Sequence, residues 1–171
     1  MVSSLDGFIA KPDNDMSWMN STDHYEQGKV LTETDIEAFL KSVDCYLMGS
    51  NTYEQALHLG WPYGEHPVYV LTNRNLKSDR ENVHFISGDL GELVESLREE
   101  FQNIWMVGGA DLTKQFLRLN LADEIVLSMI PILLGEGTLL FNYIGIEKRL
   151  HLKDTVAYQD GMVELTYSLN T

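Results

Sequence analysis

Residues 105–117 read WMVGGADLTKQFL, an apolar run that ends at two adjacent glycines and continues as a helical pattern. The apolar run predicts a buried strand, and Leu112 and Phe116 have the spacing of residues on one face of a helix. Gly108 and Gly109 lie where the strand passes into the helix, which indicates a sharp bend of the backbone or a ligand that approaches it closely. A strand followed directly by a helix is typical of an α/β protein.

The rest of the chain repeats this alternation of strand and helix. Further apolar runs predict strands at residues 5–10, 45–49, 68–72, 83–87 and 123–134. Apolar residues at helical spacing predict helices at residues 32–43, 50–59 and 89–101, besides the one that follows the glycine pair. Asp89 is expected to cap its helix, and Pro131 is expected to bend or end the long strand that contains it.

The last part of the chain predicts an antiparallel hairpin, with strands at residues 148–158 and 162–169. Val163, Leu165, Tyr167 and Leu169 alternate with polar residues, so the second strand is expected to have one buried face. Together these elements predict an α/β fold with a mostly parallel central sheet, helices on both faces and a C-terminal antiparallel hairpin. We expect residues 1–171 to form a single domain.

Composition and charge exclude several classes of function. The formal net charge of −14 argues against a nucleic-acid partner, since phosphate backbones need a basic face. No apolar run approaches the roughly 20 residues that span a bilayer, and the lone Cys45 allows no internal disulfide, so we expect a cytoplasmic protein without a membrane partner. The histidines have no metal-ligand spacing, and DNDMSW departs from a calcium loop because Trp18 replaces the required glycine, so no metal is expected.

Three polar segments follow predicted strands directly, and the carboxyl ends of parallel strands meet at one edge of a sheet. They are Gly49–Thr52, Leu71–Arg74 and Gly108–Asp111. Glycines at a strand-to-helix turn leave room for a phosphate, which the amides and the dipole of the helix N-terminus then hold. Alone, each glycine turn is more simply a tight turn or a packing site. Their joint occurrence with Arg74 favours a pyrophosphate between two turns and a further phosphate on Arg74.

Five motifs carry a resemblance to a known family. SLDGFIA, MGSNTYE, VLTNR, VGGADL and LLGEGTLLF occur in the order and rough spacing of the dihydrofolate reductase superfamily. The chain resembles most closely the reductase domain at the C-terminus of the riboflavin-biosynthesis enzyme RibD and its stand-alone bacterial relatives. The resemblance implies a dihydrofolate-reductase-like three-layer fold and an NADPH-dependent reductase. Its small-molecule substrate would be a ribosylamino-pyrimidine, as for 5-amino-6-(5-phosphoribosylamino)uracil reductase of riboflavin biosynthesis, or a pterin.

The resemblance also implies which residues bind NADPH. Those near the pyrophosphate and the nicotinamide ribose would be Gly49, Ser50, Asn51, Thr52, Gly108, Gly109, Ala110, Asp111 and Leu112. Those near the phosphate of the adenosine ribose would be Thr72, Asn73 and Arg74. The family often has a strained peptide at the double glycine, which agrees with a backbone close to the ligand.

The residues of the reaction itself are less clearly marked. Asp6 is a candidate catalytic acid, although an Asp-Gly pair is equally typical of a turn. Asp35 is a second candidate, but an acidic residue near a helix start is also favoured by the helix dipole. Trp18 is expected to shield the nicotinamide ring or to anchor its own loop, and Glu136 and Gly137 are expected to border the substrate pocket.

Two further alternatives concern the whole chain. Without a catalytic acid, the chain would be a non-catalytic nucleotide-binding or dimerisation module that keeps the fold. The apolar segment 123–141 is longer than one strand needs, and relatives of the riboflavin type pair, so we expect a homodimer.

Overall fold

The computed structural model describes residues 1–13 and 15–169, and its contacts divide the chain into two compact units. Unit 1 contains Met1–Glu33 and Lys114–Thr171, and unit 2 contains Thr34–Thr113. The chain therefore leaves unit 1, forms unit 2 and returns. The single domain expected over residues 1–171 stays a prediction.

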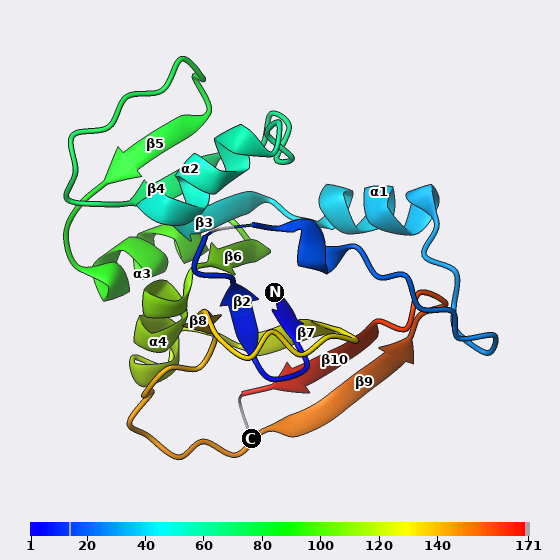
Figure 1. Ribbon diagram of the computed structural model, residues 1–171. Helices are drawn as coiled ribbons and strands as arrows, with labels where there is room; N and C mark the ends of the chain where they lie inside the picture. Colours follow the sequence, from blue (N-terminus) through cyan, green and yellow to red (C-terminus); the bar gives the residue numbers. More distant parts are fainter. Residues whose placement is uncertain (14, 170–171) are drawn as a thin grey trace. The chain divides into compact units, whose positions relative to one another are not determined.

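Unit 2 is built on a parallel four-stranded sheet with the strand order β5-β4-β3-β6 (Figure 1). Its strands are β3 (Cys45–Gly49), β4 (Val68–Leu71), β5 (Val83–Ile86) and β6 (Ile104–Gly108). The helices that accompany them are α1 (Glu33–Ser42), α2 (Ser50–His58), α3 (Leu90–Glu100) and α4 (Ala110–Arg118), which begins in unit 2 and ends in unit 1. These elements confirm the predicted alternation of strand and helix in this part of the chain.

The core of unit 2 explains why the apolar runs became strands. Met48, Val68 and Val70 are fully buried, because both faces of a parallel strand are covered. Asp89 caps α3 as predicted, since its Oδ1 accepts a hydrogen bond from the Glu92 amide at 3.0 Å. Both observations follow from local sequence patterns.

Unit 1 contains a mixed sheet with the strand order β1-β7-β10-β9 and a separate pair, β2 and β8. Its strands are β1 (Val2–Ser4), β2 (Phe8–Ala10), β7 (Glu124–Ile130), β8 (Thr138–Leu139), β9 (His151–Ala157) and β10 (Val163–Ser168), and a short 3-10 helix, η1, covers Ser17–Met19. β7 ends directly before Pro131, and β9 and β10 form the predicted antiparallel hairpin. The mixed α/β class is confirmed, with strands paired in three sheets.

Two predictions for unit 1 are wrong in detail. Residues 5–10 were expected to form one strand, but a turn closed by the Gly7 amide and the Ser4 carbonyl oxygen (3.0 Å) separates β1 from β2. Every residue of β10 is half-buried, so the expected alternation of buried and exposed side chains is absent within the strand, although Leu169, directly after it, is buried as expected. Glu164 is half-buried there, and its carboxylate accepts a hydrogen bond from the Ser128 hydroxyl at 3.0 Å.

Candidate functional site

The predicted ligand-binding segments of unit 2 follow neighbouring strands. β3 pairs in parallel with both β4 and β6, so that Gly49 lies opposite Leu71 and Met48 lies opposite Gly108. The segments 49–52, 72–74 and 108–112 start at or directly after the last residues of these strands, so they begin at one edge of the sheet (Figure 1). The strand order of unit 2 confirms this placement.

The two glycine turns lie against each other. Gly108 has φ +128°, which L side chains rarely adopt, and a cis peptide bond joins it to Gly109. A Cβ added to Gly109 would lie 3.5 Å from the hydroxyl oxygen of Thr52, and one added to Gly49 would lie 3.9 Å from the carbonyl oxygen of Gly108. The backbone conformation of Gly108 thus favours glycine, whereas a side chain at Gly109 would make ordinary contact with Thr52 in the first turn of α2.

Two helices begin at these turns. Gly49 is the N-cap of α2 with extended backbone (φ −82°, ψ 162°), and glycine offers no side chain to cap the first amides. In α4, the carbonyl oxygen of Gly109 accepts hydrogen bonds from the amide (3.0 Å) and the hydroxyl (3.1 Å) of Thr113. The first N–H groups of a helix have no partner within the helix and carry the positive end of its dipole. The adjoining N-termini of α2 and α4 form an arrangement suited to an anion.

The side chains at these N-termini differ in exposure. Ser50 and Thr52 are half-buried and Asn51 is exposed. Asp111 is an exposed acidic residue in the first turn of α4, and Leu112 has only 5% of its surface exposed. Leu112 is therefore part of the core, so only its backbone is available to a ligand.

The turn after β4 fixes the backbone of Arg74. The Thr72 amide donates to the carbonyl oxygen of Ile86 (2.9 Å), and its hydroxyl oxygen accepts a hydrogen bond from the Arg74 amide (3.0 Å). Asn73, between them, is exposed. The turn thus has a fixed backbone, and the residues Asn73 and Arg74 in it are exposed.

Arg74 already has a partner that no sequence pattern indicates. Its guanidinium forms two parallel hydrogen bonds to the Glu54 carboxylate, Nη1 to Oε2 at 2.9 Å and Nη2 to Oε1 at 2.6 Å. The hydrogen bond to Arg74 lowers the pKa of Glu54 and raises the pKa of Arg74. Glu54 belongs to the MGSNTYE motif, but no spacing rule connects it with a residue twenty positions later.

Unit 1 contains the candidate catalytic residue Asp6. Its carboxylate accepts hydrogen bonds from the Ser4 hydroxyl (2.6 Å) and from the amides of Leu134 (3.1 Å) and Gly135 (2.8 Å). The Ser4 hydrogen bond, followed by the Gly135 and Leu134 amides and opposed by partial burial, lowers the pKa of Asp6. Asp6 therefore fastens the turn after β1 to the segment that precedes β8, and its catalytic role stays a prediction.

Two of the residues expected beside the substrate lie on that same segment. Gly137 has φ +134°, and a Cβ there would overlap the carbonyl oxygen of Ala10 on the paired strand β2. Glu136 is exposed. The glycine of this motif thus allows β8 to approach β2 closely, while Glu136 is open to solvent.

Trp18 lies in η1 and has 4% of its surface exposed, which agrees with anchoring its loop. Its indole Nε1 is buried without a hydrogen-bond partner among the described residues. Asp35, the second candidate acid, is half-buried on α1 and belongs to unit 2. The two candidate acids therefore belong to different compact units.

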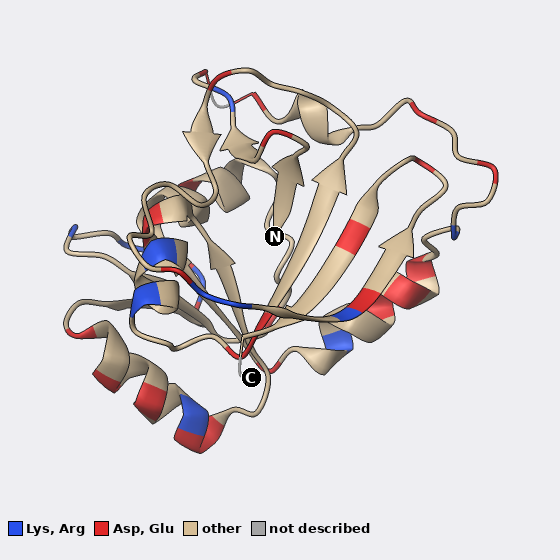
Figure 2. Ribbon diagram, turned by 90° about the horizontal axis from the view of Figure 1, so that it is seen from below, with Lys and Arg blue, Asp and Glu red and all other residues tan. Residues whose placement is uncertain are grey.

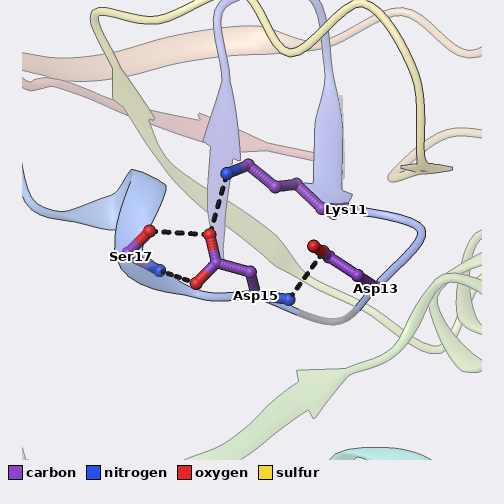
Figure 3. A network of polar contacts seen from close by, with 4 residues as sticks. All are labelled: Lys11, Asp13, Asp15 and Ser17. Carbon is purple, nitrogen blue, oxygen red and sulfur yellow. Dashed lines mark hydrogen bonds and ion pairs between the residues drawn. The ribbon is translucent and has the colours of Figure 1, made fainter.

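An ion pair between Lys11 and Asp15 holds the segment that follows β2 (Figure 3). Asp15 accepts hydrogen bonds from Lys11 Nζ (2.8 Å) and from the hydroxyl (2.6 Å) and amide (3.1 Å) of Ser17, and these contacts hold its pKa well below the usual range. The Asp13 carboxylate accepts a hydrogen bond from the Asp15 amide at 3.0 Å.

Asn14 of the DNDMSW motif lies outside the described residues. Within the described chain, no three His, Cys, Asp or Glu side chains are grouped to hold a metal ion.

Comparison with solved structures defines the class of protein. The fold matches a putative riboflavin biosynthesis protein from Shewanella sp. PV-4, with a TM-score of 0.85 and 27% identity, over 100% of this chain and 97% of that one. It also matches dihydrofolate reductase from Enterococcus faecalis, solved in complex with NADP(H) and RAB-propyl, with a TM-score of 0.65 and 17% identity, over 99% and 94% of the two chains. The chain therefore has a reductase-type α/β fold.

A match to a family model defines the protein more narrowly than the reductase-type fold does. The RibD C-terminal domain family matches residues 1–164, and the chain belongs to that family. A relative, the uncharacterized protein YwjB of Bacillus subtilis (strain 168), is 33% identical over 168 residues, which cover 96% of this chain and 92% of YwjB. These matches confirm the resemblance carried by the five motifs, while the assignment of individual residues to cofactor and substrate stays a prediction.

No helix in the described part of the chain is long and apolar enough to cross a membrane.

Proposed function

We propose that this protein is an NADPH-dependent reductase of a small heterocyclic compound, with its cofactor bound at the carboxyl ends of β3, β4 and β6. One observation carries the proposal: the N-termini of α2 and α4 adjoin at Gly49 and Gly109, where a Cβ on Gly109 would face Thr52. Membership of the RibD C-terminal domain family supports the reductase class.

The charge of the chain explains why such a local arrangement is needed. The protein has a formal net charge of −14, and acidic side chains outnumber basic ones along α1 and α3 (Figure 2). The overall field therefore repels an anionic dinucleotide. Backbone amides at two helix N-termini, with the hydroxyls of Ser50 and Thr52, would hold the pyrophosphate against that repulsion.

Arg74 would bind the phosphate on the adenosine ribose. It is exposed at the end of β4, the strand next to β3, so one dinucleotide could extend from the glycine turns to Arg74. Guanidinium groups bind phosphate through charge-assisted, often paired hydrogen bonds. A preference for NADPH over NADH follows.

The bound cofactor would supply a hydride, and the protein would orient the acceptor and exclude water. Family membership favours a ribosylamino-pyrimidine substrate over a pterin. Because Asp6 has a lowered pKa and accepts three hydrogen bonds, it is suited to hold the segment around Glu136 rather than to donate a proton near neutral pH.

The test is a titration of the full chain with NADPH and with NADH. Arg74→Ala should weaken NADPH binding roughly tenfold or more and leave NADH binding nearly unchanged, since only NADPH carries the extra phosphate. Lys77→Ala is the matched control, because Lys77 is an exposed cation three residues further along and should affect neither cofactor strongly. An equal loss for both cofactors in Arg74→Ala would refute the assignment.

The hydrogen bonding of Asp6 favours a second candidate, a nucleotide-binding module without catalysis. A panel of ribosylamino-pyrimidines and pterins distinguishes the two. Oxidation of bound NADPH with any of them supports the reductase, whereas tight binding without turnover on the whole panel supports the module.

A further inference from the structure

The Glu54–Arg74 ion pair changes the charge of the site proposed for the adenosine-ribose phosphate. The two hydrogen bonds, at 2.9 and 2.6 Å, use one N–H from each terminal nitrogen of the guanidinium. Five N–H groups are present on a guanidinium, so three remain, including the one on Nε. Arg74 can therefore hold a second anion while it stays paired with Glu54.

A phosphate on the remaining N–H groups would have a carboxylate close by. The Arg74 and Glu54 side chains are 51% and 42% exposed, so both pairing and repulsion act through a partly aqueous medium. A carboxylate on the other edge of one guanidinium still lies within the Debye length, which is about 8 Å at physiological ionic strength. Glu54 neutralises the cation that receives the phosphate and repels the phosphate itself.

The Glu54 carboxylate suits an adenosine ribose that carries no 2′-phosphate, as in NADH. In dinucleotide sites, an acidic side chain beside the adenosine ribose accepts a hydrogen bond from its 2′-hydroxyl, whereas an arginine accommodates the 2′-phosphate. Here α2 and the turn after β4 bring both kinds of side chain into direct contact. At this place Arg74 suits the 2′-phosphate of NADPH, and Glu54 suits the 2′-hydroxyl of NADH.

We propose that Glu54 is a specificity-determining residue that reduces the preference for NADPH over NADH, by opposing the 2′-phosphate at Arg74 and by accepting the 2′-hydroxyl of NADH. This inference rests on the proposed cofactor site. It predicts that removing the charge of Glu54, with little change of shape, tightens NADPH binding.

Glu54→Gln should tighten NADPH binding about threefold to tenfold, as expected for one carboxylate charge near a dianion in a partly screened medium. NADH binding should stay the same or weaken. Calorimetric titrations with adenosine 2′,5′-bisphosphate and with AMP should give the same contrast, which locates the effect at the adenosine end. Glu37→Gln is the matched control, because Glu37 is an exposed carboxylate paired with Lys41 on α1 and its loss changes the net charge equally.

A structural role for Glu54 makes the opposite prediction. If Glu54 served to hold Arg74 in place, Glu54→Gln would weaken NADPH binding and would have no effect once Arg74 is removed. The proposal instead expects Arg74→Ala/Glu54→Gln to bind NADPH at least threefold more tightly than Arg74→Ala, since an unopposed carboxylate repels the phosphate more strongly. Weaker or unchanged NADPH binding in Glu54→Gln, or no gain in the double variant, overturns the inference.

The two proposals fail in different ways. If the wild-type chain binds NADPH and only the Glu54 variants behave otherwise than expected, the specificity role is wrong and the cofactor site stands. If the wild-type chain binds neither NADPH nor NADH, the proposed function is wrong, and the role of Glu54 falls with it.

Discussion

Replacing Gly109 with alanine separates a ligand-binding role of the double glycine from a purely structural one. The φ of Gly109 lies outside the left-handed region, and the added Cβ would lie in ordinary contact with the Thr52 hydroxyl at 3.5 Å. The folded chain therefore accommodates the methyl group, and the free energy of unfolding should change by no more than about 0.5 kcal/mol. For a chain of this size, that corresponds to about 2 °C in the melting temperature.

The same methyl group would occupy the space proposed for the pyrophosphate. Each hydrogen bond between an amide and a charged group that is lost costs roughly 1.5–3 kcal/mol, so NADPH affinity should fall by at least about tenfold. Gly108→Ala is the comparison, because its φ of +128° is strained for alanine. That strain costs about 1–3 kcal/mol, a fall of roughly 2–12 °C in the melting temperature.

Thermal melting without cofactor and NADPH titration at 20 °C measure the two effects separately. Gly109→Ala should melt like the wild type and bind NADPH poorly, while Gly108→Ala should melt early. Wild-type affinity for NADPH in Gly109→Ala would refute the reasoning, and the pyrophosphate site would then lie away from this turn.

Three further predictions concern other parts of the chain. Because the pKa of Asp6 is lowered in the folded protein, its charge stabilises the fold above the pKa of an unfolded aspartate, about 3.9, and this contribution is lost as the pH falls through the folded value. Asp6→Asn should therefore lower the melting temperature at pH 7 more than at pH 3, and an equal shift at both would contradict this role. Cys45 is fully buried, and burial raises the pKa of its thiol to about 12. A thiol reagent should therefore label Cys45 only after the protein unfolds. Rapid labelling of the native protein would show that Cys45 is not buried. The segment 123–141, which is expected to form a homodimer, exposes three large apolar side chains: Leu133 (69%), Leu139 (39%) and Phe141 (41%). Light scattering at micromolar concentration should therefore give the mass of a dimer. The mass of a monomer would contradict this prediction.

The sequence by itself determined the order of the elements and the positions of the glycine turns. Hydrophobic spacing is set by the helix and strand periods, so local patterns were enough to predict β3, α2 and the strand that ends at Gly108. The cap at Asp89 and the end of β7 before Pro131 are also local, because each depends on the backbone of a few adjacent residues. The parallel strands then placed the three candidate ligand-binding segments at one edge of the sheet.

Only the tertiary structure decided which side chains meet. Arg74 pairs with Glu54 across twenty residues, and Asp6 accepts the Gly135 amide across 129 residues, although neither spacing follows a helix or strand period. Both contacts depend on which elements become neighbours and on how far each strand extends. The same dependence separated β1 from β2, since the turn from Ser4 to Gly7 contains Asp6, whose carboxylate accepts a hydrogen bond from the segment before β8. Such contacts carry no local signal because their free energy comes from groups that are brought together only by folding.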